Sequence, residues 1–411
     1  MDQERIRELS AREAERFAAR TPASKAMFER AQRTLAGGVS SSFHGREPWP
    51  VYLARGDGAL VWDADGNEYV DFHNGFSAMV QGHAHPAVVA AVRERVALGT
   101  HFGATTEDAV AVAEELRRRF GLPRWRFTNS GTEANMAAIR LARAFTGREA
   151  VVQMAGAYHG HAEITHLHEV PFNDVTALER LIEEFEPACV ITEGAMTSVG
   201  LVLPEPGYLD ALRELTRRHG VVLILDEVKT GLTIAAGGAV ERLGAQPDMV
   251  TLAKSLGGGL PTGAVGMTAE LAEPVEEGRL RLLGTYNGNP LSMAAARSSL
   301  HEVLTPAAYG ELDRLGDRMV SACENVIEAN GLEARCVGLG SKGCVKWAGG
   351  PELSQLIWIW LMNRGVLTTA GRAQEWNVTV AHDDEAVDRY VEAFAGLVAE
   401  LTPRLSGSAR A

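Results

Sequence analysis

From about residue 85 onward, short runs of wholly apolar residues alternate with longer stretches that carry apolar residues at helical spacing. Examples of the runs are "VVLILDE" (221–227) and "DMVTLAK" (248–254), and examples of the stretches are "EANMAAIRLARAF" (133–145) and "YLDALRELTRRHG" (208–220). A strand that is apolar at every position is buried on both faces, which is typical of a parallel sheet covered by helices. The pattern predicts an α/β fold with a mostly parallel central sheet.

The chain has 411 residues, which is more than one hydrophobic core usually serves. Residues 51–72 alternate apolar and polar side chains around "DADGN", a pattern that predicts antiparallel hairpins. We therefore expect a large domain at 76–304. An N-terminal segment (1–75) and a C-terminal segment (305–411) are expected to form a smaller α+β domain together.

Charge and composition exclude several classes of protein. The formal net charge is −13 and lysine and arginine do not cluster, which argues against a nucleic-acid partner. No stretch of about 18 uncharged apolar residues predicts a membrane helix, and the first 20 residues lack the apolar centre of a signal peptide, so we expect a cytoplasmic protein. The four cysteines have no metal-ligand spacing, and the histidines between 159 and 168 have no paired carboxylate, so no metal is expected.

Polar residues stand where three apolar runs end, which is where ligands collect in open parallel sheets. These residues are Ser130-Gly131-Thr132, Asp226 and Lys254. Each has an ordinary explanation of its own: a helix cap, a structural ion pair and a solvent-directed lysine. Together they suit the phosphate, the ring nitrogen and the aldehyde of pyridoxal phosphate. Side chains at 257–259 would then collide with the coenzyme or a neighbouring chain, which would account for the three glycines there.

Several motifs in order strengthen this interpretation: "GHAHP" (82–86), "FTNSGTEAN" (127–135), "AYHGH" (157–161), "LDEVKTG" (225–231), "LAKSLGGGLPTGAVGM" (252–267) and "GTYNGNPLSMAA" (284–295). With them the chain resembles the class III aminotransferases, which are fold-type I pyridoxal-phosphate enzymes. It is most similar to glutamate-1-semialdehyde 2,1-aminomutase and the β-amino-acid aminotransferases. The resemblance runs from about residue 35 to the last helix.

The resemblance implies a role for each matching residue. Lys254 would form the Schiff base, Asp226 would face the pyridine nitrogen, and Ser130, Gly131 and Thr132 would hold the phosphate. The ring would lie between Tyr158 and Val228. Thr285 would reach the phosphate of a neighbouring subunit, which implies a homodimer with shared sites. Lys229 is a rival for the Schiff base, but its flanking residues are polar or turn-forming.

The substrate region departs from the family. By ungapped alignment, the arginine that binds the substrate carboxylate in the aminomutases falls on His44, and that of the β-amino-acid enzymes falls on Ser41; neither side chain copies the guanidinium fork. Arg46 and Arg372 are the nearest substitutes. Glu193 is followed by glycine where relatives have proline.

The segment after "AYHGH" is also shorter than the loop that gates the aminomutase site. The sequence therefore predicts ping-pong transfer of an amino group from an amine or amino acid to a carbonyl acceptor. The altered pocket suggests a secondary-metabolite, sugar or cyclitol substrate. An aminomutase, and a decarboxylase or epimerase on the same scaffold, are the alternatives.

Overall fold

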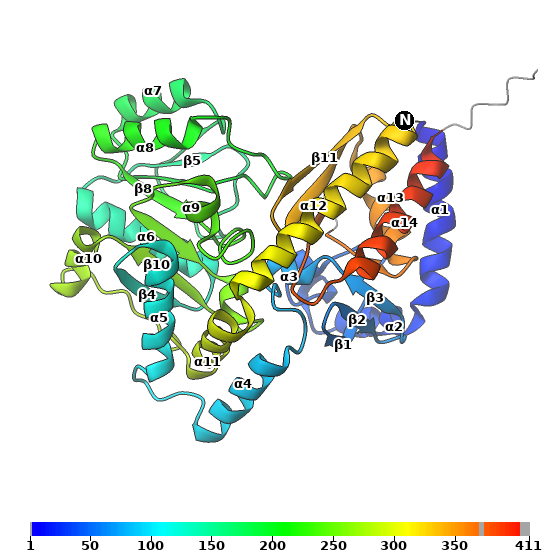
Figure 1. The fold of residues 1–411 in the computed structure, drawn as a ribbon, viewed down its shortest axis with the longest axis horizontal. Helices are drawn as coiled ribbons and strands as arrows, with labels where there is room; N and C mark the ends of the chain where they lie inside the picture. The colour runs from blue at the N-terminus through cyan, green and yellow to red at the C-terminus, as the bar shows by residue number, and fades with distance from the viewer. Residues whose placement is uncertain (1, 370–373, 403–411) are drawn as a thin grey trace, which may run out of the picture. The chain divides into compact units, whose positions relative to one another are not determined.

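The computed structural model describes residues 2–369 and 374–402, and the chain divides into two compact units (Figure 1). The first unit combines residues 1–74, 82–84 and 314–411, and the second combines residues 75–81 and 85–313. The α+β unit is thus built from both ends of the chain.

The first unit contains two small sheets. One has the order β1-β2-β3-β13, in which the first three strands are antiparallel and β13 joins β3 in parallel; the other is the antiparallel sheet β11-β12-β14. The strands are β1 (Leu53–Asp57), β2 (Leu60–Asp63), β3 (Glu68–Asp71), β11 (Ala334–Leu339), β12 (Lys342–Trp347), β13 (Val366–Leu367) and β14 (Gln374–Asn377). The helical elements are α1 (Gln3–Arg20), α2 (Pro22–Ala31), η1 (Ala36–Gly38), η2 (Ser42–His44), most of α12 (Pro306–Ala329), α13 (Pro351–Met362) and α14 (Asp384–Leu401), while α3 (Asn74–Ser77) lies at the boundary.

The second unit is built on a seven-stranded sheet of order β4-β10-β9-β8-β7-β5-β6, in which β10 alone runs antiparallel to its neighbours. Its strands are β4 (Arg124–Thr128), β5 (Val151–Met154), β6 (Leu167–Val170), β7 (Cys189–Thr192), β8 (Val222–Asp226), β9 (Met249–Leu252) and β10 (Gly263–Met267). The helical elements are α4 (Pro86–Leu98), α5 (Glu107–Phe120), α6 (Gly131–Thr146), α7 (Val175–Phe185), α8 (Tyr208–Arg218), α9 (Gly238–Leu243), η3 (Lys254–Gly257), α10 (Ala269–Glu276), α11 (Pro290–Ser298) and η4 (Ser299–Val303).

Successive residues of the central strands face opposite sides of the sheet, and helices cover both sides. Val151 and Ile224 pack in a cluster with the alanines of α6 and with Leu271 of α10. Val152 and Leu223 pack on the other side, with apolar residues of α7 and α8. The wholly apolar strands are therefore buried on both faces, and their ends are the places where polar residues reach a surface.

Candidate active site

The carboxyl ends of β4, β5, β7, β8 and β9 lie along one edge of the large sheet. Strands β5, β7, β8 and β9 are parallel, and β4 has the same direction because β10 runs antiparallel to both β4 and β9. Ser130, Glu193, Asp226 and Lys254 each follow or end one of these strands. The residues predicted from strand ends thus share one edge, where open α/β sheets bind ligands.

Helix α6 begins at Gly131, directly after β4 and a short turn. Ser130 is its N-cap, with Oγ accepting a hydrogen bond from the backbone N–H of Glu133 at 3.2 Å, so the ordinary role of a helix cap is present. A Cβ on Gly131 would lie 2.9 Å from Cγ1 of Val228 and 3.5 Å from Cβ of Ala253. The start of α6 therefore meets the residues that follow Asp226 and precede Lys254, and the N–H groups at the start of a helix suit an anion.

The loop from β5 to β6 packs on the same helix start. Gly160 has a φ of +107°, and a Cβ there would lie 2.5 Å from Oγ1 of Thr132, whose hydroxyl is 3.4 Å from Nδ1 of His161. Tyr158 stands two residues earlier and is 45% exposed. An aromatic ring thus stands exposed in the loop that covers the helix start.

Asp226 is a buried carboxylate with three hydrogen-bond donors around it. Oδ2 accepts from Nδ2 of Asn135 and from Nδ1 of His159, each at 2.7 Å, and Oδ1 accepts from the N–H of Val228 at 2.9 Å. Burial is the largest influence and raises the pKa of Asp226, but the bonds from His159, Val228 and Asn135 together hold that pKa below its ordinary value. The site therefore keeps an ionised carboxylate in surroundings with little water.

Lys254 follows β9 and Ala253, and it is half-buried with a φ of +42°. A lysine in the left-handed region is strained by about 1–3 kcal/mol, and such strain is typical of functional sites. The glycines that follow Lys254 allow close contacts within the chain. A Cβ on Gly257 would lie 2.8 Å from Cγ2 of Thr262, and Gly259, at φ +93°, would place one 2.8 Å from Sδ of Met79. These glycines therefore make close contacts within the chain itself, and their predicted role beside a coenzyme or a neighbouring chain stays a prediction.

Glu193 is buried and bound on both oxygens by one residue. Its Oε2 accepts from the N–H of Thr197 at 3.1 Å and its Oε1 from the Thr197 hydroxyl; burial and then the charge of Asp226 help to raise its pKa. Nζ of Lys229, the rival lysine, donates to the carbonyl oxygen of Thr197 at 2.9 Å. A Cβ on Gly194 would lie 2.4 Å from Cβ of Ala239, so a larger residue at this position would require α9 to move.

Thr285, Ser41, His44 and Arg372 are the remaining predicted residues. Thr285 is exposed in the loop between α10 and α11. Ser41 and His44 belong to the first unit, where Oγ of Ser41 accepts from the N–H of Phe43 at 3.4 Å and Nδ1 of His44 lies 3.1 Å from Oγ of Ser40. Arg372 lies outside the described residues. The roles of these side chains stay predictions.

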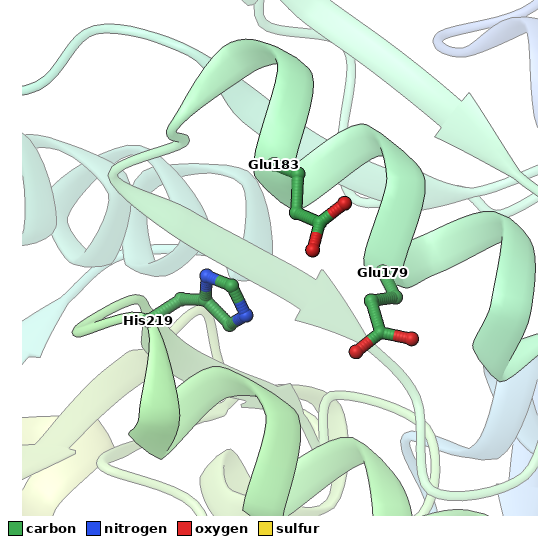
Figure 2. A group of neighbouring side chains, drawn as sticks. All are labelled: Glu179, Glu183 and His219. Carbon is green, nitrogen blue, oxygen red and sulfur yellow. The ribbon is translucent and has the colours of Figure 1, made fainter.

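Within the described ranges, one group of side chains has the composition of a metal site. Glu179 and Glu183 on α7 and His219 after α8 turn toward one another, with ligand atoms within 4.8 Å (Figure 2). Glu179 already lies 3.3 Å from the guanidinium of Arg218, and all three side chains are at least partly exposed. Since Glu179 already has a cationic partner and exposed acidic groups commonly lie together without an ion, this group does not by itself indicate a metal site.

Sequence reasoning missed three polar residues of this site: Asn135 and His159, which bind Asp226, and Thr251, which binds Asn135. His159 was visible in the "AYHGH" motif, but only as a possible metal ligand. Asn135 gave a weaker signal, a polar residue on a face of α6 that is otherwise alanine, isoleucine and leucine. Its partner Thr251 lies 116 positions away, with Oγ1 donating to Oδ1 of Asn135 at 2.6 Å.

This fold and this edge of the sheet define a pyridoxal-phosphate-dependent transferase of fold type I. The sequence model of the family "Aminotransferase class-III" matches residues 41–166 and 164–340. The chain belongs to the class III aminotransferases, and it is therefore an enzyme that uses pyridoxal phosphate.

Relatives and solved structures agree with this family. The chain is 34% identical over 414 residues to glutamate-1-semialdehyde 2,1-aminomutase 2 of Brevibacillus brevis, covering 90% of this chain and 96% of the relative. A lysine-to-alanine variant of a glutamate-1-semialdehyde-aminomutase from Pseudomonas aeruginosa PAO1, in complex with PMP, has a TM-score of 0.93 at 30% identity and covers 98% of this chain and 99% of its own. A β-phenylalanine aminotransferase from Variovorax paradoxus has a TM-score of 0.91 at 31% identity, with 96% and 97% covered.

The side chains at the sheet edge fit this coenzyme. A helix start without a Cβ suits its phosphate, and Asp226 is a buried carboxylate that is kept ionised and can pair with a protonated ring nitrogen. The helix start and the carboxylate of Asp226 therefore match the chemistry of the family to which the chain belongs. Across the described residues, the helices are all too short or too polar to span a lipid bilayer.

Proposed function

We propose that this enzyme moves an amino group from an amine or amino acid donor to a carbonyl acceptor by a ping-pong mechanism. The observation that carries the proposal is the close contact at Gly131 between the start of α6 and the segments after β8 and β9. Its missing Cβ would lie 2.9 Å from Val228 and 3.5 Å from Ala253, which places the helix start beside the neighbours of Asp226 and Lys254. This chemistry requires three parts: a site for the phosphate, a carboxylate that pairs with the protonated ring nitrogen, and an amine that reacts with the aldehyde.

Each residue then has a separate task. The N–H groups at the start of α6, with Ser130 and Thr132, bind the phosphate. Asp226 holds a proton on the ring nitrogen. Tyr158 and Val228 restrict the ring from its two faces. When bound, pyridoxal phosphate supplies an aldehyde for the donor's amine and a ring that accepts electrons. The amine of Lys254 removes a proton from the donor carbon and returns one during transfer to the acceptor.

A homodimer with shared sites is part of the proposal. Thr285 lies in an exposed loop between two exposed apolar side chains, Leu283 (81% exposed) and Tyr286 (60% exposed). Leu98 and Phe102 are also more than half exposed, and Asn289, just after the loop, donates to the carbonyl oxygen of Thr100 at 3.1 Å. Exposed apolar groups of this kind favour a protein partner, and a second copy would bring Thr285 to the neighbouring phosphate.

Transfer between two molecules is favoured over isomerisation of one. An aminomutase must retain its intermediate between two half-reactions, which needs a gate, whereas residues 155–166 form only a short connection from β5 to β6. The names of the relatives favour the second candidate, a glutamate-1-semialdehyde-type aminomutase. Incubation with that single substrate tests it: product without an added acceptor would support isomerisation.

The substrate we propose is a secondary-metabolite carbonyl compound, a sugar or a cyclitol. Ser41 and His44 stand where relatives carry the arginine for the substrate carboxylate, and neither offers its paired donors. Glu193 has both oxygens bound by Thr197, so it would line the pocket as a fixed acceptor. Arg372 stays a candidate anion-binding residue.

A donor panel read by absorbance tests the proposed function. True donors should convert the aldehyde form of the bound coenzyme to its amine form, and a carbonyl acceptor should reverse the change. Lys254→Ala should show neither change. A decarboxylase or epimerase would instead release carbon dioxide or invert the donor without accumulating the amine form. The substrate assignment is wrong if Ser41→Arg and His44→Arg leave amino acid turnover unchanged while sugar and cyclitol donors stay inert.

A further inference from the structure

The two oxygens of Asp226 have unequal surroundings. Oδ2 accepts from Asn135 Nδ2 and His159 Nδ1, both at 2.7 Å, whereas Oδ1 accepts at 2.9 Å from the N–H of Val228. A carboxylate oxygen has two lone pairs in the plane of the group. Oδ2 is therefore saturated, and Oδ1 keeps one lone pair for a further donor.

Asn135 is held in a single orientation by three bonds. Besides Asp226, its Nδ2 donates to the carbonyl oxygen of His159 at 2.9 Å, and its Oδ1 accepts from Oγ1 of Thr251 at 2.6 Å. Asn135 is 3% exposed and Thr251 is fully buried. Turning the amide over would place its oxygen against Asp226 and its nitrogen against Thr251. The amide group thus ties α6 to the ends of β8 and β9 and to the loop after β5.

His159 supports the same oxygen from the other side. Because a carboxylate oxygen can only accept, Nδ1 is the nitrogen that carries the hydrogen toward Asp226. The imidazole is buried, and its Nε2 has no hydrogen-bond partner within the described ranges. The side chain therefore makes its one hydrogen bond to Asp226, and a partner at Nε2 does not explain its place in the core.

We propose that Asn135 and His159 are positioning residues that occupy Oδ2 of Asp226 and so leave Oδ1 as the single acceptor for the coenzyme's ring nitrogen. This inference rests on the proposed role of Asp226 and adds how that role is enforced. Without these two donors the carboxylate could rotate and share both oxygens with its surroundings. It would also hold a proton more strongly, because the bonds that favour its charged form would be lost. The proton would then lie less on the ring nitrogen and more on Asp226.

The test uses holoenzyme reconstituted with pyridoxal phosphate that carries ¹⁵N in the ring. The ¹⁵N NMR shift reports whether the ring nitrogen is protonated, and titration of apoprotein with coenzyme gives the dissociation constant. In Asn135→Leu and His159→Leu the signal should move toward that of the neutral ring, and the affinity should fall about tenfold, which is 1.4 kcal/mol. His159→Asn should restore both, because an asparagine amide can donate from the place of Nδ1.

Two further variants keep the test decisive. Thr251→Val does not touch Asp226 but releases the amide of Asn135, so it should move the ring signal in the same direction by less. It replaces the two leucine variants if these fail to fold. Asn363→Leu is the matched control: this asparagine is equally buried, lies in the other unit and donates to Glu13, so its loss should lower stability and leave the ring signal unchanged.

The outcomes separate this inference from the proposed function. An unprotonated ring in the wild-type enzyme, or no change in Asp226→Asn, would remove the role of Asp226 itself. A clear change in Asp226→Asn with wild-type signals and affinities in folded Asn135, His159 and Thr251 variants would overturn the positioning role alone.

Discussion

Gly131 and Val228 approach each other so closely that a Cβ on Gly131 would lie 2.9 Å from Cγ1 and 3.0 Å from Cγ2 of Val228. One residue begins α6 and the other is the second residue after β8, so this contact sets the distance between the proposed phosphate and ring positions. A methyl group there cannot be accommodated without moving one of the two elements.

Gly131→Ala should therefore weaken coenzyme binding about tenfold and lower the free energy of unfolding by about 1–3 kcal/mol, because the new methyl overpacks the contact. Titration of apoprotein with coenzyme and chemical denaturation measure the two effects. Gly131→Ala combined with Val228→Ala should recover most of the lost stability, because the smaller side chain at position 228 leaves room for the new methyl group.

Gly310→Ala is the matched control, since Gly310 lies in α12 with nothing within 4 Å of its Cβ position. It should raise stability by about 0.5–1 kcal/mol, as glycine to alanine does in exposed helices. Wild-type binding by Gly131→Ala would show that the contact has no influence on the site.

The two lysines near the sheet edge should differ in covalent chemistry. After borohydride reduction of the holoenzyme, mass spectrometry should find the coenzyme on the peptide that contains Lys254. Lys254→Ala should lose this adduct and at least about 10³-fold in turnover, because it removes both the attachment point and the general base.

Lys229→Met is the companion variant. Nζ of Lys229 donates to the carbonyl oxygen of Thr197, so the substitution removes a local hydrogen bond and should leave the adduct on Lys254. An adduct that persists in Lys254→Ala and disappears in Lys229→Met would reverse the assignment of the two lysines.

The sequence predicts the frame of the site because that frame depends on local patterns. A strand that is apolar throughout must be buried on both faces, so the polar residue at its end marks the ligand edge, as for Asp226 and Lys254. The turn chemistry around Gly131 is also local. Fold and coenzyme could therefore be predicted before the structure was known.

What the sequence does not predict depends on distant contacts. Asn135 meets Thr251 and Asp226 only after α6 packs on β8 and β9, and Gly259 meets Met79, which lies 180 positions away in the sequence. A glycine in the sequence indicates that a side chain would not fit at that position, but it does not identify the neighbouring atom. The sequence therefore indicates that glycine is needed after Lys254, but it does not reveal the contacts that these glycines make within the chain.

Shared active sites predict that two inactive variants restore each other. Lys254→Ala and Thr285→Asp should each be nearly inactive, the second because a carboxylate repels the phosphate across the subunit contact. In a mixed dimer one site carries both lesions and the other carries none. Random mixing should therefore recover about a quarter of wild-type activity if the enzyme is a dimer with shared sites.

Unfolding and refolding the two variants together, followed by a rate assay, measures this recovery, and each variant refolded alone is the control. Native mass and analytical ultracentrifugation should show a dimer in all samples. Dimers without any recovery would mean that Thr285 acts within its own subunit.

Glu227 should make stability depend on pH near neutrality. Its carboxylate is fully buried and accepts from the N–H groups of Ala239 at 2.6 Å and Val240 at 3.1 Å, and burial is the main cause that raises the pKa of Glu227 to about 7. From about pH 4.5 to 7 the folded state keeps this proton while the unfolded chain releases it. The folded state then binds more protons, so its stability falls as pH rises through that range and levels off above it.

Glu227→Gln keeps an acceptor for Ala239 and Val240 but cannot titrate. Relative to this variant, wild-type protein should lose roughly 3 kcal/mol of unfolding free energy between about pH 4.5 and pH 7.5. Urea denaturation at half-unit steps of pH measures the two curves, with the exposed Glu205→Gln as the control for net charge. Parallel curves for wild type and Glu227→Gln would mean that this carboxylate ionises at the same pH in the folded and unfolded chains, and that the bonds to α9 offset the effect of burial.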